Sequence, residues 1–179
     1  SFTMSDTDLK SGDTSTVTII FSEAVAGFAN SDVTVVNGAL TTMTSSDNIT
    51  WTGTYTPTAD VEDATNVLIL ATSYTDTAGN AGPSATTANF TIDTTAPTVS
   101  SFTMSDTDLK SGDTSTVTIV FSEAVAGFAS VSDVTIVNGA LASMTSSDNI
   151  TWTGTYTPTA NVEDATNVLT LATSYTDTA

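Results

Sequence analysis

Short segments of the chain alternate strictly between apolar and polar residues. In STVTIIFSE (15–23), Val17 and Ile19 fall on one face and the threonines on the other. The segments ITWTGTYTPT (49–58) and ATNVLILATSYTD (64–76) show the same period of two residues. This period is typical of strands that bury one face, and no segment shows the period of a helix. The pattern therefore predicts an all-β chain.

The same alternation predicts which side chains lie in the core. We expect Leu68, Leu70 and Tyr74 to point inward, which leaves position 69 facing solvent. Trp51 alternates with threonines and is expected in the core rather than on the surface as a sugar-binding platform. The outward threonines suit an exposed strand face better than a ligand-binding surface.

The segment ANFTID (88–93) is predicted to be the last strand of its repeat. We expect it to pair with the strand at 65–75 and to cover the core with Phe90 and Ile92. Burying such side chains stabilises a small domain by about 1.5–3 kcal/mol each. A repeat without this strand would have an open edge, which can pair with another chain.

Turn signals separate the predicted strands. VVNGAL (35–40) is predicted to be a hairpin with Asn37-Gly38 as a type I′ turn. About seven short strands per hundred residues, with turns between them, are typical of an immunoglobulin-like sandwich.

The chain contains two copies of one sequence. Residues 1–30 match 101–130, and residues 31–78 match 132–179 after an inserted Val131. The differing positions are Ile20/Val120, Asn30/Ser130, Val35/Ile136, Thr41/Ala142, Thr42/Ser143, Asp60/Asn161 and Ile69/Thr170. A period of about 100 residues suits one small domain per repeat rather than a solenoid unit. We therefore expect two tandem immunoglobulin-like β-sandwich domains arranged end to end.

The predicted boundaries follow from the repeat. The first domain is expected to span 1–93 and the second 98–179, with a short linker at 94–97. Pro97 restricts the backbone there, so the joint should be semi-rigid. The second copy lacks an equivalent of 79–93, and we expect its sandwich to be completed by further chain or by a strand from a neighbour.

Composition and charge exclude several classes of function. The net charge is −18 at pH 7, with 20 acidic residues against Lys10 and Lys110. Nucleic acids and anionic membranes are bound through basic residues, so neither is an expected partner. Cysteine and histidine are absent, which removes disulfides, imidazole bases and zinc sites. Because no nucleophile lies beside a base, we expect no enzymatic activity.

Three motifs carry a resemblance to a known family. FSEAVAGF, YTDTAGNAG and DTTAPTVSSF resemble the bacterial immunoglobulin-like repeats of giant surface adhesins, including the extender arrays of RTX adhesins exported by type I secretion. The resemblance implies an extracellular location on the bacterial cell surface and a role in adhesion and biofilm formation. It also implies a spacer that contacts neighbouring repeats of the same monomeric chain, without direct membrane contact. Several subclasses of this family bind calcium between domains.

Acidic residues gather near the predicted joint. Strand reversals place one group at the end of copy 1 and another at the facing end of copy 2. Carboxylates 4 Å apart repel by about 4 kcal/mol at an effective dielectric near 20, and a hard cation such as Ca²⁺ reverses this repulsion. The expected calcium ligands are Asp93, Glu123, Asp133, Asp177, Asp6, Asp8 and Asp63. The alternative is that these acids only keep loops solvated.

The sequence leaves a second function open. The pair could be a carbohydrate- or protein-binding accessory module of a secreted enzyme or receptor. An exposed aromatic cluster, or a loop that differs strongly between the copies, would favour this alternative. The substitutions between the copies are small, and they provide neither feature.

Overall fold

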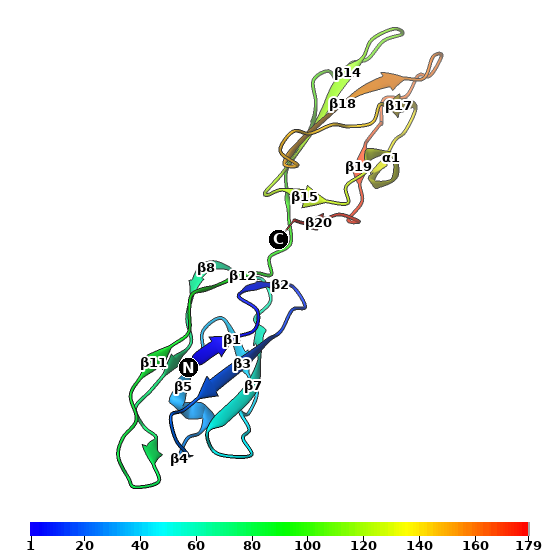
Figure 1. Ribbon diagram of the computed structural model, residues 1–179. Helices are drawn as coiled ribbons and strands as arrows, with labels where there is room; N and C mark the ends of the chain where they lie inside the picture. Colours follow the sequence, from blue (N-terminus) through cyan, green and yellow to red (C-terminus); the bar gives the residue numbers. More distant parts are fainter. Residues whose placement is uncertain (179) are drawn as a thin grey trace. The chain divides into compact units, whose positions relative to one another are not determined.

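The chain folds as two compact units. The computed structural model describes residues 1–178, and its contacts divide the chain into Ser1–Thr95 and Ala96–Ala179, here called unit 1 and unit 2. Almost all regular elements of each unit are short strands, which Figure 1 labels in chain order. The predicted all-β class is confirmed.

One sheet of unit 1 has four antiparallel strands. Its centre is formed by β3 (Ser15–Ile20) and β7 (Thr50–Pro57), with β1 (Phe2–Met4) beside β3 and β6 (Gly38–Leu40) beside β7. These are the alternating segments of the sequence, and their inward faces supply the first half of the core.

The opposite side of unit 1 is made of shorter pieces. There β12 (Phe90–Asp93) lies between β2 (Asp8–Lys10), to which it is parallel, and β8 (Glu62–Asn66), to which it is antiparallel. The remaining elements are β5 (Val33–Thr34), β9 (Ile69–Leu70) and β11 (Ala85–Thr86) in one sheet, β4 (Val25–Ala26) and β10 (Thr75–Asp76) in another, and the 3₁₀ turn η1 (Asn30–Asp32). The single strand predicted over 64–76 is therefore divided among β8, β9 and β10.

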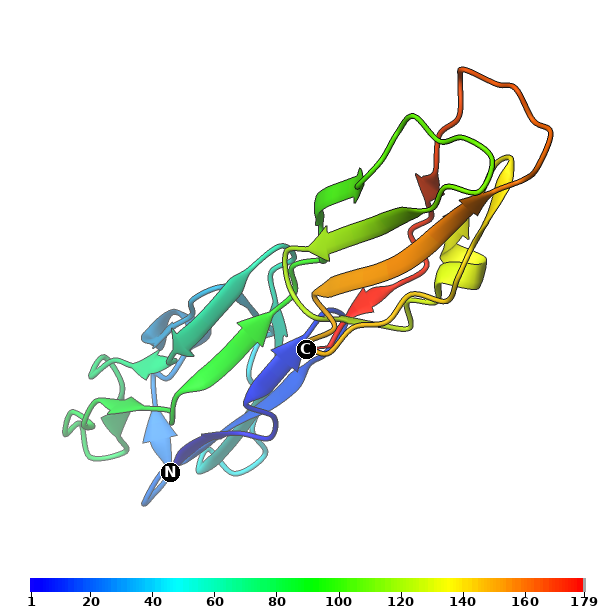
Figure 2. The same ribbon diagram turned by 90° about the horizontal axis from the view of Figure 1, so that it is seen from above.

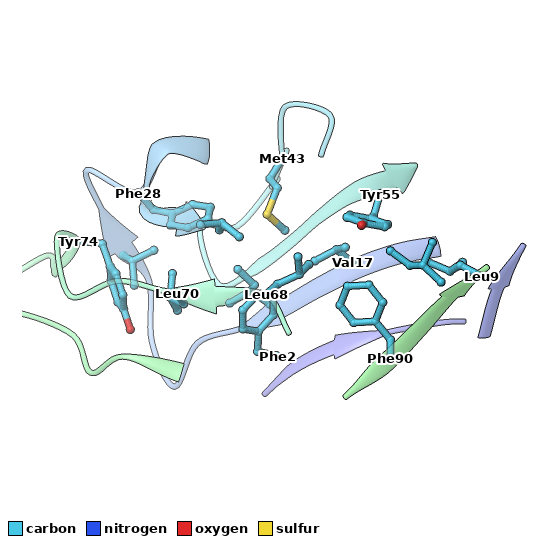
Figure 3. Close-up of a cluster of buried hydrophobic side chains, with 14 residues drawn as sticks. Phe2, Leu9, Val17, Phe28, Met43, Tyr55, Leu68, Leu70, Tyr74 and Phe90 are labelled. Carbon is cyan, nitrogen blue, oxygen red and sulfur yellow. The ribbon is translucent and has the colours of Figure 1, made fainter. Parts of the chain in front are cut away.

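The core of unit 1 lies between these layers. Leu68, Leu70 and Tyr74 are buried as predicted, whereas Ile69 is 40% exposed. Phe90 and Ile92 are also buried, as expected for the last strand of the repeat. Figure 3 shows the buried side chains converging from both layers.

The predicted hairpin at 35–40 is wrong. The strands on either side of Asn37 belong to different sheets, because β5 pairs with β9 whereas β6 pairs with β7. The segment is therefore a crossover between the layers. Asn37 has the expected positive φ of 49°, but Gly38 does not have the positive φ that a type I′ turn requires. Gly38 is needed for another reason, since a Cβ there would overlap the Tyr55 ring.

Unit 2 repeats the four-stranded sheet. The order is β13 (Val99–Met104), β14 (Ser115–Phe121), β18 (Thr151–Pro158) and β17 (Gly139–Leu141). Figure 2 shows β18, in orange, running beside the yellow-green β14. The shorter elements are β15 (Val125–Ala126) with β20 (Thr176–Asp177), β16 (Val134–Thr135) with β19 (Thr170–Leu171), and α1 (Ser130–Asp133).

Two differences distinguish unit 2 from unit 1. The inserted Val131 lies in α1, where it is 75% exposed, so the insertion is absorbed as a longer helical turn on the surface. In addition, residues 108–110 and 163–167 form no strands, although their counterparts in unit 1 are β2 and β8. Those two strands flank β12 in unit 1, and the described part of unit 2 contains no counterpart of β12.

Candidate functional site

The chain leaves unit 1 at a well-defined place. After β12 ends at Asp93, Thr94 donates its Oγ1 hydrogen to the carbonyl of Thr58 over 2.8 Å. The backbone nitrogen of Thr94 donates to the Val61 carbonyl over 2.8 Å, and the Val61 nitrogen donates to Thr94 Oγ1 over 2.9 Å. These bonds fix Asp93 at the end of the sandwich that also carries the loop after β7.

Asp93 has both an acidic and a basic neighbour. In the strand register it lies opposite Glu62 of β8 on one side and Lys10 of β2 on the other. Paired residues point to the same face of a sheet, so these three side chains form an outward row. The Asp93 carboxylate is half-buried and accepts a bond from the Thr95 nitrogen over 3.3 Å.

Asp6 and Asp8 lie in the loop beside the same strand. Asp6 Oδ1 accepts a hydrogen bond from the Asp8 nitrogen over 3.1 Å. Asp8 Oδ1 accepts one from Thr91 Oγ1 over 2.8 Å, which ties the loop to β12. Both predicted ligands therefore lie at the same end of unit 1 as Asp93.

The structure uses Asp63 within its own unit. Its Oδ1 accepts hydrogen bonds from the nitrogen and Oγ1 of Thr65 over 2.8 and 3.2 Å, and its Oδ2 accepts one from Asn37 Nδ2 over 2.9 Å. The hydrogen bond from the Thr65 backbone is the main reason why the pKa of Asp63 is lowered. Glu62 was not among the predicted ligands, although it is the acid that lies opposite Asp93 in the register. The irregular register between Phe90 and Ile92 decides which acid lies there, and no local pattern signals that irregularity.

The chain enters unit 2 at an acidic end. The Ser122 nitrogen donates to the Thr98 carbonyl over 2.8 Å, and the Thr98 nitrogen donates to Ser122 Oγ over 2.9 Å. The half-buried Glu123 follows directly. At the same end β15 pairs with β20, which places Asp177 opposite Val125. Two of the predicted ligands of unit 2 thus lie where the chain enters it.

Asp133 has a different role. It is 4% exposed, and its carboxylate accepts hydrogen bonds from the Ala129 nitrogen over 2.7 Å, from Ser132 Oγ over 3.1 Å and from Ser174 Oγ over 2.5 Å. The bond from Ser174 is the largest cause of its lowered pKa. Its counterpart Asp32 is held in the same way in unit 1. The carboxylate ties α1 to the segment before β20.

Backbone amides stabilise the ionised form of other acids in the loops. Oδ1 of Asp148 accepts hydrogen bonds from the nitrogens of Ile150 and Thr151, each over 2.9 Å. The bond from Thr151 contributes most to lowering the pKa of Asp148. Asp47 repeats this arrangement in unit 1. A chain with two basic residues therefore satisfies many carboxylates with its own backbone.

Neither unit holds a complete cation site by itself. Among the described residues of each unit, no three acidic side chains lie together in a group that could hold a metal ion. Of the seven predicted ligands, Asp6, Asp8 and Asp93 are located at the end where the chain leaves unit 1, but they do not form such a group. Glu123 and Asp177 lie at the end where it enters unit 2, whereas Asp63 and Asp133 are held by internal hydrogen bonds.

The structure gives no indication of a membrane-crossing helix. Across residues 1–178, no helix has the length and apolar character needed to span a bilayer.

Comparison with known proteins identifies the type of domain. The family model described as bacterial Ig-like domain matches residues 1–92 and again residues 93–179. Searches of curated proteins and of solved structures gave no match. Domains of this type are typically non-catalytic and are commonly extracellular or surface-exposed structural modules. Since the two matches span the whole chain and each falls on one all-β unit, the chain belongs to the bacterial Ig-like domain family, as a tandem of two repeats.

Proposed function

We propose that the two units are spacer repeats of a bacterial cell-surface adhesin and hold a distal binding domain away from the cell. The observation that carries this proposal is the path of the chain through unit 1. The Ile20 nitrogen donates to the Ser1 carbonyl over 2.8 Å, so the chain enters beside the end of β3. It leaves beside Thr58 and Val61, beyond the end of β7. Because β3 and β7 are antiparallel, these places are opposite ends of the sandwich.

Such a path suits a spacer. Each repeat that passes the chain from one end to the other adds its own length to the array. The eight residues of β7 alone extend about 26 Å at roughly 3.3 Å per residue. A module that served only to bind a ligand would not require this arrangement of its ends.

We further propose that calcium stiffens the joint between the repeats. Asp93 lies where the chain leaves unit 1, Glu123 and Asp177 lie where it enters unit 2, and only 94–97 separates Asp93 from Thr98. Oxygen ligands from both ends would suit the six to eight positions that Ca²⁺ accepts. Asp6 and Asp8 would add to the site from unit 1. Asp63 and Asp133 would contribute negative potential rather than direct ligands, since donors already occupy their oxygens.

The alternative function, a binding module, receives less support. A carbohydrate platform requires exposed aromatic faces. Trp51 instead packs edge-on against Phe28 with centroids 4.8 Å apart, and Trp152 packs in the same way against Phe128 at 4.9 Å. Both tryptophans therefore serve the packing of their units.

Calcium titration of the whole chain tests the proposal. Thermal melting should shift upward with calcium, because a ligand at 100 times its Kd stabilises the folded state by about 2.7 kcal/mol. Small-angle scattering should show an extended pair that becomes less variable in calcium. Magnesium at equal concentration should do less, because it demands stricter geometry.

Matched variants separate a specific site from charge screening. Asp93→Asn should abolish most of the calcium shift. Asp60→Asn is the control, because it removes the same charge from the same end of unit 1 and introduces the residue that the second copy carries as Asn161. If millimolar calcium leaves melting unchanged, the calcium site does not exist. If both variants reduce the calcium-dependent increase in melting temperature equally, calcium acts only by screening the negative charges.

A further inference from the structure

The chain contains three triplets of the form Asn-X-Thr, which is the acceptor pattern for asparagine-linked glycosylation. They begin at Asn48, Asn89 and Asn149. Asn48 and Asn149 are equivalent residues of the two repeats, whereas Asn89 directly precedes β12. All three asparagines are exposed, so exposure alone does not distinguish them. The hydrogen bonds and the packing of each triplet do.

Asn48 lies in a turn that other side chains hold together. Ser45 Oγ donates to Asp47 Oδ1 over 3.0 Å and accepts a hydrogen bond from the Asn48 nitrogen over 2.9 Å. Asp47 Oδ1 also accepts from the nitrogens of Ile49 and Thr50 over 2.9 and 2.8 Å. Asn48 contributes to this network through its backbone, and its side-chain amide makes no hydrogen bond within the described residues 1–178.

Unit 2 builds the same turn around Asn149. Ser146 Oγ donates to Asp148 Oδ1 over 2.9 Å, and that oxygen accepts from the nitrogens of Ile150 and Thr151. Asn48 and Asn149 have positive φ angles of 57° and 59°. This left-handed conformation accounts for an asparagine in the turn, but it does not require a threonine two residues later. Both units therefore present an exposed Asn-Ile-Thr triplet at the start of a central strand.

Most other asparagines use their side-chain amides inside the fold. Seven of them donate Nδ2 hydrogens to protein oxygens, and these are Asn30, Asn37, Asn66, Asn80, Asn89, Asn138 and Asn167. A sugar on one of these nitrogens would displace an internal partner, which costs stability. A sugar on Asn48 or Asn149 would displace none.

The triplet at Asn89 is held in the fold at all three positions. Asn89 Nδ2 donates to the Ala64 carbonyl over 2.9 Å, and Thr91 Oγ1 donates to Asp8 Oδ1 over 2.8 Å. Between them, Phe90 is 1% exposed. A transferase that binds the triplet would have to pull β12 away from the core. The fold therefore distinguishes this triplet from the other two.

We propose that Asn48 and Asn149 are acceptor sites for asparagine-linked glycosylation of the folded chain, and that Asn89 is not. The co-substrate is a sugar activated as a diphosphate, carried by a nucleotide or by a lipid. The side-chain nitrogen bonds to the anomeric carbon as the bond from that carbon to the diphosphate oxygen breaks. The diphosphate leaves with the electron pair, and the amide nitrogen loses one proton to a base of the transferase.

Treatment of the folded 179-residue chain with a sugar donor tests the proposal. One arm supplies UDP-glucose and a soluble transferase specific for Asn-X-Thr. The other supplies an oligosaccharide on a lipid diphosphate and a membrane-bound oligosaccharyltransferase. In at least one arm the intact mass should increase by two glycans per chain, and peptide mapping should place them on Asn48 and Asn149. The arm that succeeds identifies the carrier of the donor.

Asn89 is the control within the same chain. It should be modified at least about a hundredfold more slowly than Asn48, because it reacts only from open states in which β12 has left the core. Two synthetic peptides remove the fold from the comparison, TSSDNITWTG (44–53) and ATTANFTIDT (85–94). Both should be modified, which would assign the difference in the folded chain to its structure.

Chain variants test the role of each triplet. Asn48→Gln and Asn149→Gln should each remove one glycan. Thr50→Val should remove the glycan at Asn48, and Thr50→Ser should retain it because the hydroxyl is kept. Thr52→Val is the matched control, since it changes an exposed threonine of the same strand outside the triplet and should leave both glycans in place.

Three results would overturn the proposal. The first is a folded chain that neither arm modifies, whether or not the 44–53 peptide is modified. The second is modification of Asn89 as fast as that of Asn48, since the fold would then select nothing. The third is a peptide 85–94 that is not modified while peptide 44–53 is, because local sequence rather than the fold would then explain the difference.

Discussion

Asn37 joins the two layers of unit 1 through Asn66, whose Oδ1 lies 2.8 Å from the Asn37 side-chain nitrogen. Asn37 belongs to the crossover between β5 and β6, whereas Asn66 ends β8. Asn37 makes this contact from a left-handed backbone conformation, with a positive φ of 49°. The bond therefore depends on a backbone conformation that asparagine tolerates better than most residues.

Replacing this asparagine should affect the two units unequally. Asn37→Ala removes two hydrogen bonds and leaves the buried Asn66 with fewer partners, so we expect a loss of about 1–3 kcal/mol in the unfolding free energy of unit 1. Asn138→Ala should cost less, because the corresponding residues are more exposed in unit 2. Denaturant unfolding of both variants measures the difference. Equal losses would show that the cost comes from the backbone conformation alone.

Removing the Phe90 side chain of β12 should strongly destabilise unit 1. Phe90→Ala removes a fully buried ring from the edge of Tyr55, and such changes cost about 3–5 kcal/mol. The control is Ile69→Thr, which changes a 40% exposed residue to the threonine found at position 170 and should cost less than about 0.5 kcal/mol. In thermal unfolding, unit 1 of the Phe90→Ala variant should melt at a much lower temperature than unit 1 of the unchanged chain. A shift as small as that of the control would contradict this account of β12.

Gly38 should be intolerant of a side chain for steric reasons. Gly38→Ala places a Cβ against the ring of Tyr55, whose hydroxyl donates to the Val36 carbonyl over 2.7 Å. Overpacking of this kind costs about 1–3 kcal/mol. The same Cβ also meets the backbone carbonyl of Thr56, so a double-mutant cycle with Tyr55→Leu should relieve only the part of the cost that comes from the ring. If the two changes were simply additive, the contact with the Thr56 carbonyl rather than with the tyrosine ring would explain why a side chain is not tolerated at position 38.

The stability of both units should fall in acid. Hydrogen bonds lower the pKa values of Asp47, Asp63, Asp148 and Asp164 below the ordinary value of an aspartate. A carboxyl whose folded pKa is lowered stabilises the fold above its unfolded pKa, and this contribution is lost as the pH falls through the folded value. Melting temperatures should therefore be nearly constant from pH 7 to about pH 5 and should decrease below about pH 4.

Two variants and added salt test the cause of this decrease. Asp148→Asn should reduce the acid dependence of unit 2, and Asp47→Asn that of unit 1. Because these carboxylates are bonded to backbone amides rather than to lysines, 0.5 M salt should change the slope little. Charge repulsion in a chain of net charge −18 weakens as carboxylates are protonated, so a melting temperature that rises in acid would contradict this account.

The two central strands β3 and β7 and the buried faces could be predicted from the sequence because alternation is a local signal, whereas the division of 64–76 into three strands could not. Leu68, Leu70, Phe90 and Ile92 are all buried as the pattern requires. The crossover at Asn37 could not be predicted in the same way, since an Asn-Gly pair fits a hairpin until the partners of both flanking strands are known. These partners are distant in sequence.

The surroundings of the candidate calcium ligands could not be predicted from local sequence either. That Asp93 and Glu62 share a row depends on the register between β12 and β8, which includes an irregularity. That Asp133 is buried depends on Ser174, which is 41 residues away. Sequence reasoning could place acids at an end of the sandwich, but it could not show which of them are occupied by internal hydrogen bonds.

The central sheets of the two units have the same register. Ser15 lies opposite Tyr55 in unit 1, and Ser115 lies opposite Tyr156 in unit 2. Each strand of one sheet could therefore pair with the partner strand of the other without losing a hydrogen bond or exposing a core residue. During refolding only the shorter loop within each unit favours the correct pair, since closing a longer loop costs more entropy. Refolding of the tandem should consequently produce a fraction of molecules with strands interchanged between the repeats, which refolding of either repeat alone could not produce.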